Sequence, residues 1–242
     1  MDHPKIVPQA EWLAARKKFL IKEKEFTRER EALNAERRKL PMVRIEKDYV
    51  FEGPSGRRTL GDLFEGRRQL IVYHFMFDPA WETGCKNCSF VADHFAGALL
   101  HLAARDTSFA VISRAPIEKI ERFKKRMEWG FPWLSSFGSD FNYDFQVTID
   151  EAHPENNYRR AYREPDLQGK GPTEGEAPGL SVFLRNGEHL YHTYSTYLRG
   201  LDPFINTYNF LDHTPLGRQE EDGREMAWVR HHDKYSEGTS ND

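Results

Sequence analysis

Two thiols separated by two residues are the strongest chemical signal in this sequence. Cys85 and Cys88 are the only cysteines among 242 residues, which excludes a disulfide scaffold. They follow an apolar run and precede a helical pattern, so we expect them at a helix N-terminus. Unpaired backbone N–H groups there, together with Lys86, would stabilise a thiolate. We therefore predict that Cys85 is a nucleophile and that Cys88 resolves a mixed disulfide by attacking it.

The same spacing occurs in zinc sites and in pairs of unrelated buried thiols. Zinc needs two further ligands, and His189 and His192 are three residues apart on an expected strand, so they point to opposite faces. The remaining histidines that we considered as ligands are His74, His94 and His153. No histidine directly follows Cys88, so the haem-attachment pattern is absent. We expect no metal and no other cofactor.

The elements that must position the thiols are a βαβ unit. An apolar run at residues 69–77 predicts a strand buried on both faces, residues 88–104 predict a helix, and residues 108–113 predict a second buried strand. Pro116 is suited to the first position of a further helix that ends near Gly130. Apolar runs at residues 180–184 and 188–194 flank a turn that contains Asn186 and Gly187, which predicts a hairpin. This order predicts an α/β fold.

Both ends of the chain differ in composition from this centre. Residues 11–40 are charge-dense and contain no Gly or Pro, which predicts a long helix. Its apolar side chains recur every seven residues, at Trp12, Phe19, Phe26, Leu33 and Leu40. Such a stripe favours either packing on its own domain or contact with a second subunit. We predict an N-terminal helical arm (1–41), a central domain (42–213) with a polar segment at 150–179, and a polar, loosely ordered tail (214–242).

Composition limits the possible partners. The chain has 35 Lys and Arg against 38 Asp and Glu, a net charge of -3, which argues against a nucleic-acid binder. It contains no apolar run of about 20 residues and no N-terminal signal pattern, so we expect no membrane association and a cytoplasmic location.

Residues 177–188 resemble the segment of thioredoxins in which a proline precedes an apolar strand and a Lys/Arg-Asn-Gly-Glu turn. In thioredoxins that proline is cis and faces the thiol pair, and the residue before it pairs with bound peptide. The resemblance implies substrate-binding roles for Pro178 and Ala177, with a trans proline that closes the polar segment as the alternative. Trp81 resembles the tryptophan that precedes the thioredoxin cysteines, although packing alone would also explain it.

His74 lies near the position of a buried carboxylate in thioredoxins. A histidine at that position could take the proton from Cys88 as it attacks. A hydrogen-bonded core histidine without a chemical role is the alternative.

Several motifs together are similar to one bacterial thioredoxin-like family of unknown function, described as predicted dithiol–disulfide oxidoreductases. The longest are WLAAR from Trp12, RRKLP from Arg37, EKDYVF from Glu46, YHFMF from Tyr73, CKNCSF from Cys85 and HTYSTY from His192. The resemblance implies a thioredoxin-like three-layer sandwich that carries the helical arm and the polar tail.

The predicted function is thiol–disulfide exchange at Cys85 and Cys88, with a protein or small-molecule disulfide as substrate and a thiol as electron donor. A peroxiredoxin-like thiol peroxidase is one alternative, because residues 49–64 resemble the N-terminal hairpin of that branch. The other is a non-enzymatic binding module that dimerises through its arm, so a homodimer is among the expected partners.

Overall fold

The structure is a computed structural model, and it describes residues 4–149, 175–221 and 224–235. Most of the polar segment predicted at residues 150–179, with His153, lies outside these ranges. An eight-stranded sheet has the order β1-β10-β9-β4-β5-β6-β2-β3. Its strands are β1 (Val43–Arg44), β2 (Val50–Gly53), β3 (Gly56–Thr59), β4 (Gln69–His74), β5 (Thr107–Ser113), β6 (Trp133–Ser135), β9 (Gly179–Asn186) and β10 (His189–Tyr197). A separate pair joins β7 (Thr148–Ile149) to β8 (Gly175–Glu176).

The centre of the sheet is the predicted βαβ unit. Strands β4 and β5 are parallel and adjacent, and β9 pairs with β4 in the antiparallel sense. Leu70, Val72 and Tyr73 of β4 are 0% exposed, which confirms that this strand is buried on both faces. The predicted hairpin is formed by β9 and β10 around Gly187, whose φ of 61° is readily adopted by glycine.

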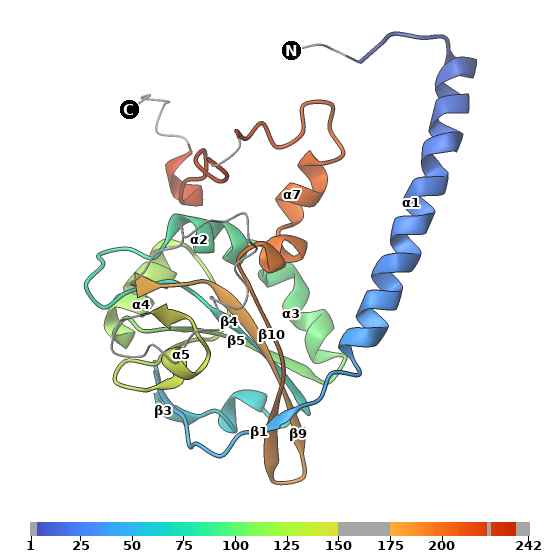
Figure 1. The fold of residues 1–242 in the computed structure, drawn as a ribbon. Helices are drawn as coiled ribbons and strands as arrows, with labels where there is room; N and C mark the ends of the chain where they lie inside the picture. Colours follow the sequence, from blue (N-terminus) through green and yellow to red (C-terminus); the bar gives the residue numbers. More distant parts are fainter. Residues whose placement is uncertain (1–3, 150–174, 222–223, 236–242) are drawn as a thin grey trace.

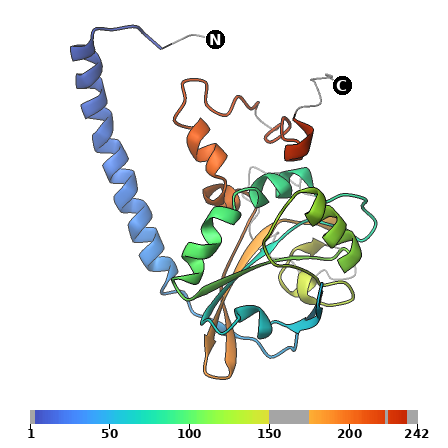
Figure 2. The same cartoon turned by 180° about the vertical axis from the view of Figure 1, so that it is seen from behind.

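Helices cover both faces of the sheet and form the outer layers (Figures 1 and 2). One face carries α2 (Lys86–Ala92), α3 (Ala96–Ala103), α4 (Ile117–Arg126) and α7 (Asn206–Leu211), and the other carries η1 (Asp62–Phe64) and α5 (Phe141–Asp144). Two apolar clusters fill the spaces between the layers, one centred on Phe75 and Trp133 and the other on Phe51 and Phe141. The fold is therefore the predicted thioredoxin-like three-layer sandwich.

Two helices differ from the predicted ranges. The single helix expected at residues 88–104 is split into α2 and α3, with Asp93 and His94 at the break. Their side chains bind groups distant in the sequence, since Asp93 accepts a hydrogen bond from Trp129 Nε1 and His94 Nε2 bonds to Thr207. The residue pair Asp202-Pro203 also predicts a helix start in the sequence, but Pro203 lies in the 3₁₀ helix η3 (Leu198–Phe204) and the α-helix that follows, α7, begins only at Asn206.

The N-terminal arm is α1 (Gln9–Arg37), which stands away from the sheet for most of its length (Figures 1 and 2). It has no buried residue, and Phe26 is 64% exposed. Near its end, the guanidinium of Arg37 lies 5.1 Å from the centroid of the Tyr194 ring. Packing of the stripe on the arm's own domain, one of the two predicted alternatives, is thus not what the structure shows.

The described part of the C-terminal tail is polar, as predicted, but it is packed rather than loose. Val229 is 0% exposed and belongs to the apolar cluster on the α2 face. The short helix η4 (His232–Lys234) ends this part of the chain, above α2 in Figure 1. The tail therefore lies over the helix that begins with the two thiols.

Candidate active site

The two thiols stand where β4 leads into α2, as predicted. Cys85 is the N-cap of α2, and its backbone N–H donates to the Met76 carbonyl at 3.1 Å. The backbone N–H of Met76 in turn contacts Cys88 Sγ at 3.4 Å. The loop at residues 78–84 thus returns Cys85 to the end of the strand.

The two thiols differ in exposure and in acidity. Cys85 is partly exposed and Cys88 is 1% exposed, and both are free. A hydrogen bond from the Cys88 thiol is the largest influence that lowers the pKa of Cys85, to about 6, with backbone N–H groups of Cys88 and Asn87 and the charge of Lys86 adding to it. Cys85 is therefore largely a thiolate at neutral pH.

Cys88 is protonated in this resting arrangement. Burial is the main cause that raises its pKa well above the ordinary value, and the adjacent Cys85 thiolate raises it further. The Met76 N–H and the side chain of Tyr73 act in the opposite direction. Tyr73 is fully buried, and its own pKa is raised mainly by burial and then by the charge of Cys88. Tyr73 is thus the ionisable side chain of β4 that lies beside the second thiol.

His74 lies on the opposite face of β4 from Tyr73, because successive strand residues alternate. Its ring stacks on Phe145 at 5.9 Å between centroids, and its Nε2 is 2.8 Å from Ser181 Oγ. Burial lowers the pKa of His74 to about 3, so the ring is neutral. The contact with Cys88 that a proton acceptor needs is not formed. This geometry corresponds to the alternative prediction of a hydrogen-bonded core histidine.

Ser181 connects His74 to a second histidine across the hairpin. Ser181 Oγ lies 2.7 Å from Ser195 Oγ, which lies 2.7 Å from His192 Nε2. Burial also lowers the pKa of His192. The chain of four side chains therefore links β4, β9 and β10 on the face away from the thiols, and within the described residues the buried His74 Nδ1 has no hydrogen-bond partner.

The predicted substrate-binding residues have mixed outcomes. No peptide bond within the described ranges is cis, so the bond between Ala177 and Pro178 is trans, and the thioredoxin-like cis proline expected there is not formed. Ala177 is 4% exposed and its N–H already donates to the Val147 carbonyl at 2.7 Å. Trp81 is 37% exposed in the loop before Cys85, where a substrate can reach it.

A segment that the sequence did not assign to the site crosses directly over it. We call residues 224–235 the C-terminal strap. Lys86 Nζ donates to the Ala227 carbonyl at 3.3 Å, and His231 Nε2 is 2.9 Å from the Gly84 carbonyl. A carbonyl accepts only, so Nε2 of His231 carries a proton. The strap thereby holds the residues on both sides of Cys85, and the buried Val229 lies between its two points of attachment.

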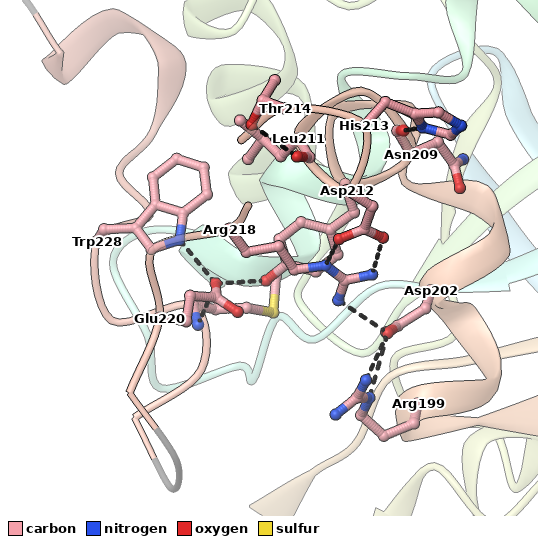
Figure 3. A network of polar contacts seen from close by, with 12 residues as sticks. Arg199, Asp202, Asn209, Leu211, Asp212, His213, Thr214, Arg218, Glu220 and Trp228 are labelled. Atoms are coloured by element: carbon pink, nitrogen blue, oxygen red, sulfur yellow. Dashed lines mark hydrogen bonds and ion pairs between the residues drawn. The ribbon is translucent and has the colours of Figure 1, made fainter. Parts of the chain in front are cut away.

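Polar contacts hold both ends of the strap. Glu220, which precedes the strap, accepts a hydrogen bond from Trp228 Nε1 at 2.7 Å (Figure 3). It also accepts one from the Tyr208 hydroxyl of α7. At the other end Arg126 of α4 pairs with Asp233 at 2.8 Å. These residues carry no local signal in the sequence, because their partners are far away along the chain.

The described residues contain no group of three or more His, Cys, Asp and Glu side chains that could hold a metal ion. They also contain no helix with the length and apolar character needed to cross a bilayer. His94, one of the alternative zinc ligands, contacts Thr207 through its Nε2 atom.

Comparison with known proteins gives a family and a set of structural neighbours. No curated protein matches the chain. The peroxidoxin BcpB from Mycobacterium tuberculosis is 15% identical, with a TM-score of 0.47, and the match covers 69% of this chain and 94% of that one. A mutant of PrxQ from Xylella fastidiosa is 11% identical, with a TM-score of 0.46, over 71% of this chain and 94% of that one. The family model described as "Bacterial protein of unknown function (DUF899)" matches residues 1–235, so the chain belongs to that family.

Proposed function

We propose that this protein is a thiol–disulfide oxidoreductase that cycles Cys85 and Cys88 between dithiol and disulfide. The observation that carries the proposal is the opposite shift in acidity of the two thiols: the pKa of Cys85 is lowered to about 6, whereas that of Cys88 is raised by burial and by the neighbouring thiolate. This difference means that Cys85 attacks first and Cys88 second, because only the thiolate is nucleophilic.

In the first step the Cys85 thiolate attacks one sulfur of a disulfide substrate. The Cys85–substrate disulfide forms, the substrate disulfide breaks, and the second substrate sulfur leaves as a thiolate. The negative charge on Cys85 is thereby lost, and with it two of the influences that raise the pKa of Cys88. Formation of the mixed disulfide therefore makes Cys88 more acidic.

In the second step Cys88 loses its proton and attacks Cys85. The Cys85–Cys88 disulfide forms and the remaining substrate sulfur leaves as a thiol that carries the proton given up by Cys88, so the substrate gains two electrons and the protein loses two. The Met76 N–H and Tyr73, both of which favour the charged form of Cys88, support this step. Tyr73 takes the position that the sequence analysis gave to His74, as a positioning residue beside the second thiol. A thiol donor returns the protein to the dithiol form.

Trapping distinguishes the roles of the two cysteines. Under mild oxidation, the wild type should form an intramolecular disulfide without unfolding, seen as a loss of two hydrogens by mass spectrometry with an unchanged circular dichroism spectrum. Cys88→Ser should accumulate a mixed disulfide with the substrate, and Cys85→Ser should not. Preferential reaction at Cys88, or stoichiometric zinc that blocks both thiols, would contradict the proposal.

The substrate is addressed by a direct comparison of insulin, glutathione disulfide and hydrogen peroxide as oxidants of the reduced protein. Faster reaction with peroxide than with either disulfide would replace this proposal with the thiol peroxidase. No reaction with any of them would favour the binding module. We place the reaction in the cytoplasm, where glutathione and thioredoxin maintain thiols in the reduced state.

We further propose that the protein is a homodimer through α1. The heptad stripe of the arm, together with Leu13 and Leu20 beside it, consists of side chains that are 38–64% exposed. With the surface areas usual for these residue types, they expose roughly 700 Å² of apolar surface. A stable interface buries about 800 Å² on each partner, so a second copy of the arm offers a match in size. The arm makes too little contact with its own domain to cover this area.

A further inference from the structure

The positive charges of Lys86 and Arg230 lie close together beside the loop that carries Cys85. Lys86 Nζ and Arg230 Nη1 donate to the same acceptor, the Ala227 carbonyl, at 3.3 Å and 3.0 Å. Arg230 also donates to the Val229 carbonyl at 3.2 Å. Within the described residues neither cation forms an ion pair with a carboxylate. One cation follows Cys85 in the chain, and the other is brought there by the strap.

The acidic groups around the loop are engaged elsewhere. Asp233 pairs with Arg126 at 2.8 Å, and Glu82 lies 3.5 Å from Lys119. Asp93 accepts from Trp129 and from His232 Nδ1, which is 2.7 Å away. Glu220 accepts hydrogen bonds from Tyr208 of α7, from the backbone N–H of Met226 and from Trp228 Nε1. Lys86 and Arg230 therefore place two cations beside the loop that carries Cys85, although the whole chain carries a net charge of -3.

The strap fixes Arg230 in this position. The adjacent His231 donates to the Gly84 carbonyl through Nε2 and accepts from Arg126 through Nδ1 at 3.2 Å. Its ring packs on Phe123 at 5.3 Å, and Val229 on the other side of Arg230 is fully buried. Arg230 itself is exposed. A guanidinium held at its base and open to solvent is suited to binding an incoming anion.

We propose that Arg230 and Lys86 select disulfides that carry carboxylates close to the sulfur atoms. This inference rests on the function proposed above and names its substrate class. The chemistry is the same exchange: Cys85 forms a bond to one substrate sulfur, the other leaves as a thiolate, and attack by Cys88 releases the first. The carboxylates take no part in bond breaking. They bring the substrate to the loop and hold it there while the sulfurs align.

The test is a single oxidation of the fully reduced protein by three small disulfides that differ in charge. Dithiodipropionate is anionic, bis(2-hydroxyethyl) disulfide is neutral and cystamine is cationic. Samples are quenched by alkylation, and the Cys85–Cys88 disulfide is quantified by mass spectrometry. The ratio of the rate constants for dithiodipropionate and cystamine is the measurement, because a change in the acidity of Cys85 affects both rates and cancels.

We expect the wild type to prefer dithiodipropionate, and added salt to reduce the preference. Arg230→Gln should lower the ratio about three- to fivefold, as expected for one exposed charge near the reacting atoms. Arg230→Lys should restore most of it. Arg224→Gln is the matched control, because Arg224 is exposed in the same strap but already lies 3.4 Å from Glu221, and its ratio should not change.

Equal ratios in the wild type and Arg230→Gln would overturn the charge selection while leaving disulfide exchange intact. Equal losses in Arg230→Gln and Arg224→Gln would also overturn it, since they would show a general effect of net charge. Failure of all three compounds to produce the Cys85–Cys88 disulfide would instead overturn the proposed function. Circular dichroism of each variant confirms that the strap substitution leaves the fold in place.

Discussion

Removal of the second thiol should make the first one less acidic. The hydrogen bond from Cys88 is the largest influence that lowers the pKa of Cys85 to about 6. A hydrogen bond to a charged group contributes about 1.5–3 kcal/mol, which corresponds to about one to two pKa units. We therefore expect Cys88→Ala to raise the pKa of Cys85 into the range of about 7 to 8. Cys88→Ser is the matched control, because its hydroxyl can still donate.

The assay is the rate of alkylation of Cys85 by iodoacetamide as a function of pH. At pH 6 about half of the wild-type thiol is ionised, and the shift in Cys88→Ala should reduce the rate about five- to fiftyfold. Above pH 9 the alkylation rates of the wild type and Cys88→Ala should converge, since Cys85 is then ionised in both proteins. A pKa near 6 in Cys88→Ala would refute the role of the Cys88 donor. An equal increase in the pKa of Cys85 in Cys88→Ala and Cys88→Ser would show that the hydrogen bond donated by residue 88 is not its only cause.

Three further perturbations test other parts of the structure. Gly84→Ala places a Cβ 2.6 Å from Phe75 Cε1, so overpacking should cost about 1–3 kcal/mol and lower Tm; an unchanged Tm would contradict the packing. Burial raises the pKa of Glu176 to about 7 despite Arg114 at 3.2 Å, so this acid favours the folded state below pH 4.5 and loses that contribution as pH rises through 7. The free energy of unfolding in urea should therefore be about 1–3 kcal/mol lower at pH 8 than at pH 5 in the wild type, and this difference should be absent in Glu176→Gln. The same difference in both proteins would contradict the role of Glu176. Phe26→Asp should convert the dimer to a monomer by light scattering at micromolar concentration with thiol reactivity unchanged, whereas a monomeric wild type would refute the arm interface.

Local patterns were sufficient to predict the elements that carry the thiols. The apolar run that forms β4 and the helix-forming residues that follow the cysteines each determine their own structure, so the position of Cys85 at the start of α2 followed from neighbouring residues. The hairpin of β9 and β10 followed in the same way from its turn residues.

The face on which each residue of β4 lies could not be predicted from that run. A strand that is apolar on both faces has no alternation to show which side meets the thiols. The sequence analysis therefore left open whether His74 lies beside Cys88 or is a hydrogen-bonded core residue. In the structure His74 binds Ser181 on the other face, and Tyr73 lies beside Cys88. The choice between the two depends on the long-range packing of Phe141 and Phe145 against the other face.

The strap was missed for a different reason. Its apolar residues are scattered among charged ones, which is the composition of a solvated tail, and its contacts to Gly84 and Lys86 join residues more than 130 positions apart. Only the fold brings those segments together. Burial of Val229 contributes about 1.5–3 kcal/mol, and the pair between Arg126 and Asp233 adds a second attachment.

These contacts are made by residues beyond position 213, where the sequence analysis predicted the end of the central domain. The residues beyond it cover the carbonyl before Cys85, bind the side chain after it and complete the apolar cluster under α2. Under the selection proposed above, Arg230 of the strap favours some of the disulfides that reach the Cys85 thiolate over others. Under the proposed function the strap therefore belongs to the site together with the helix that bears the thiols, because the two segments meet at Gly84 and Lys86, on either side of Cys85.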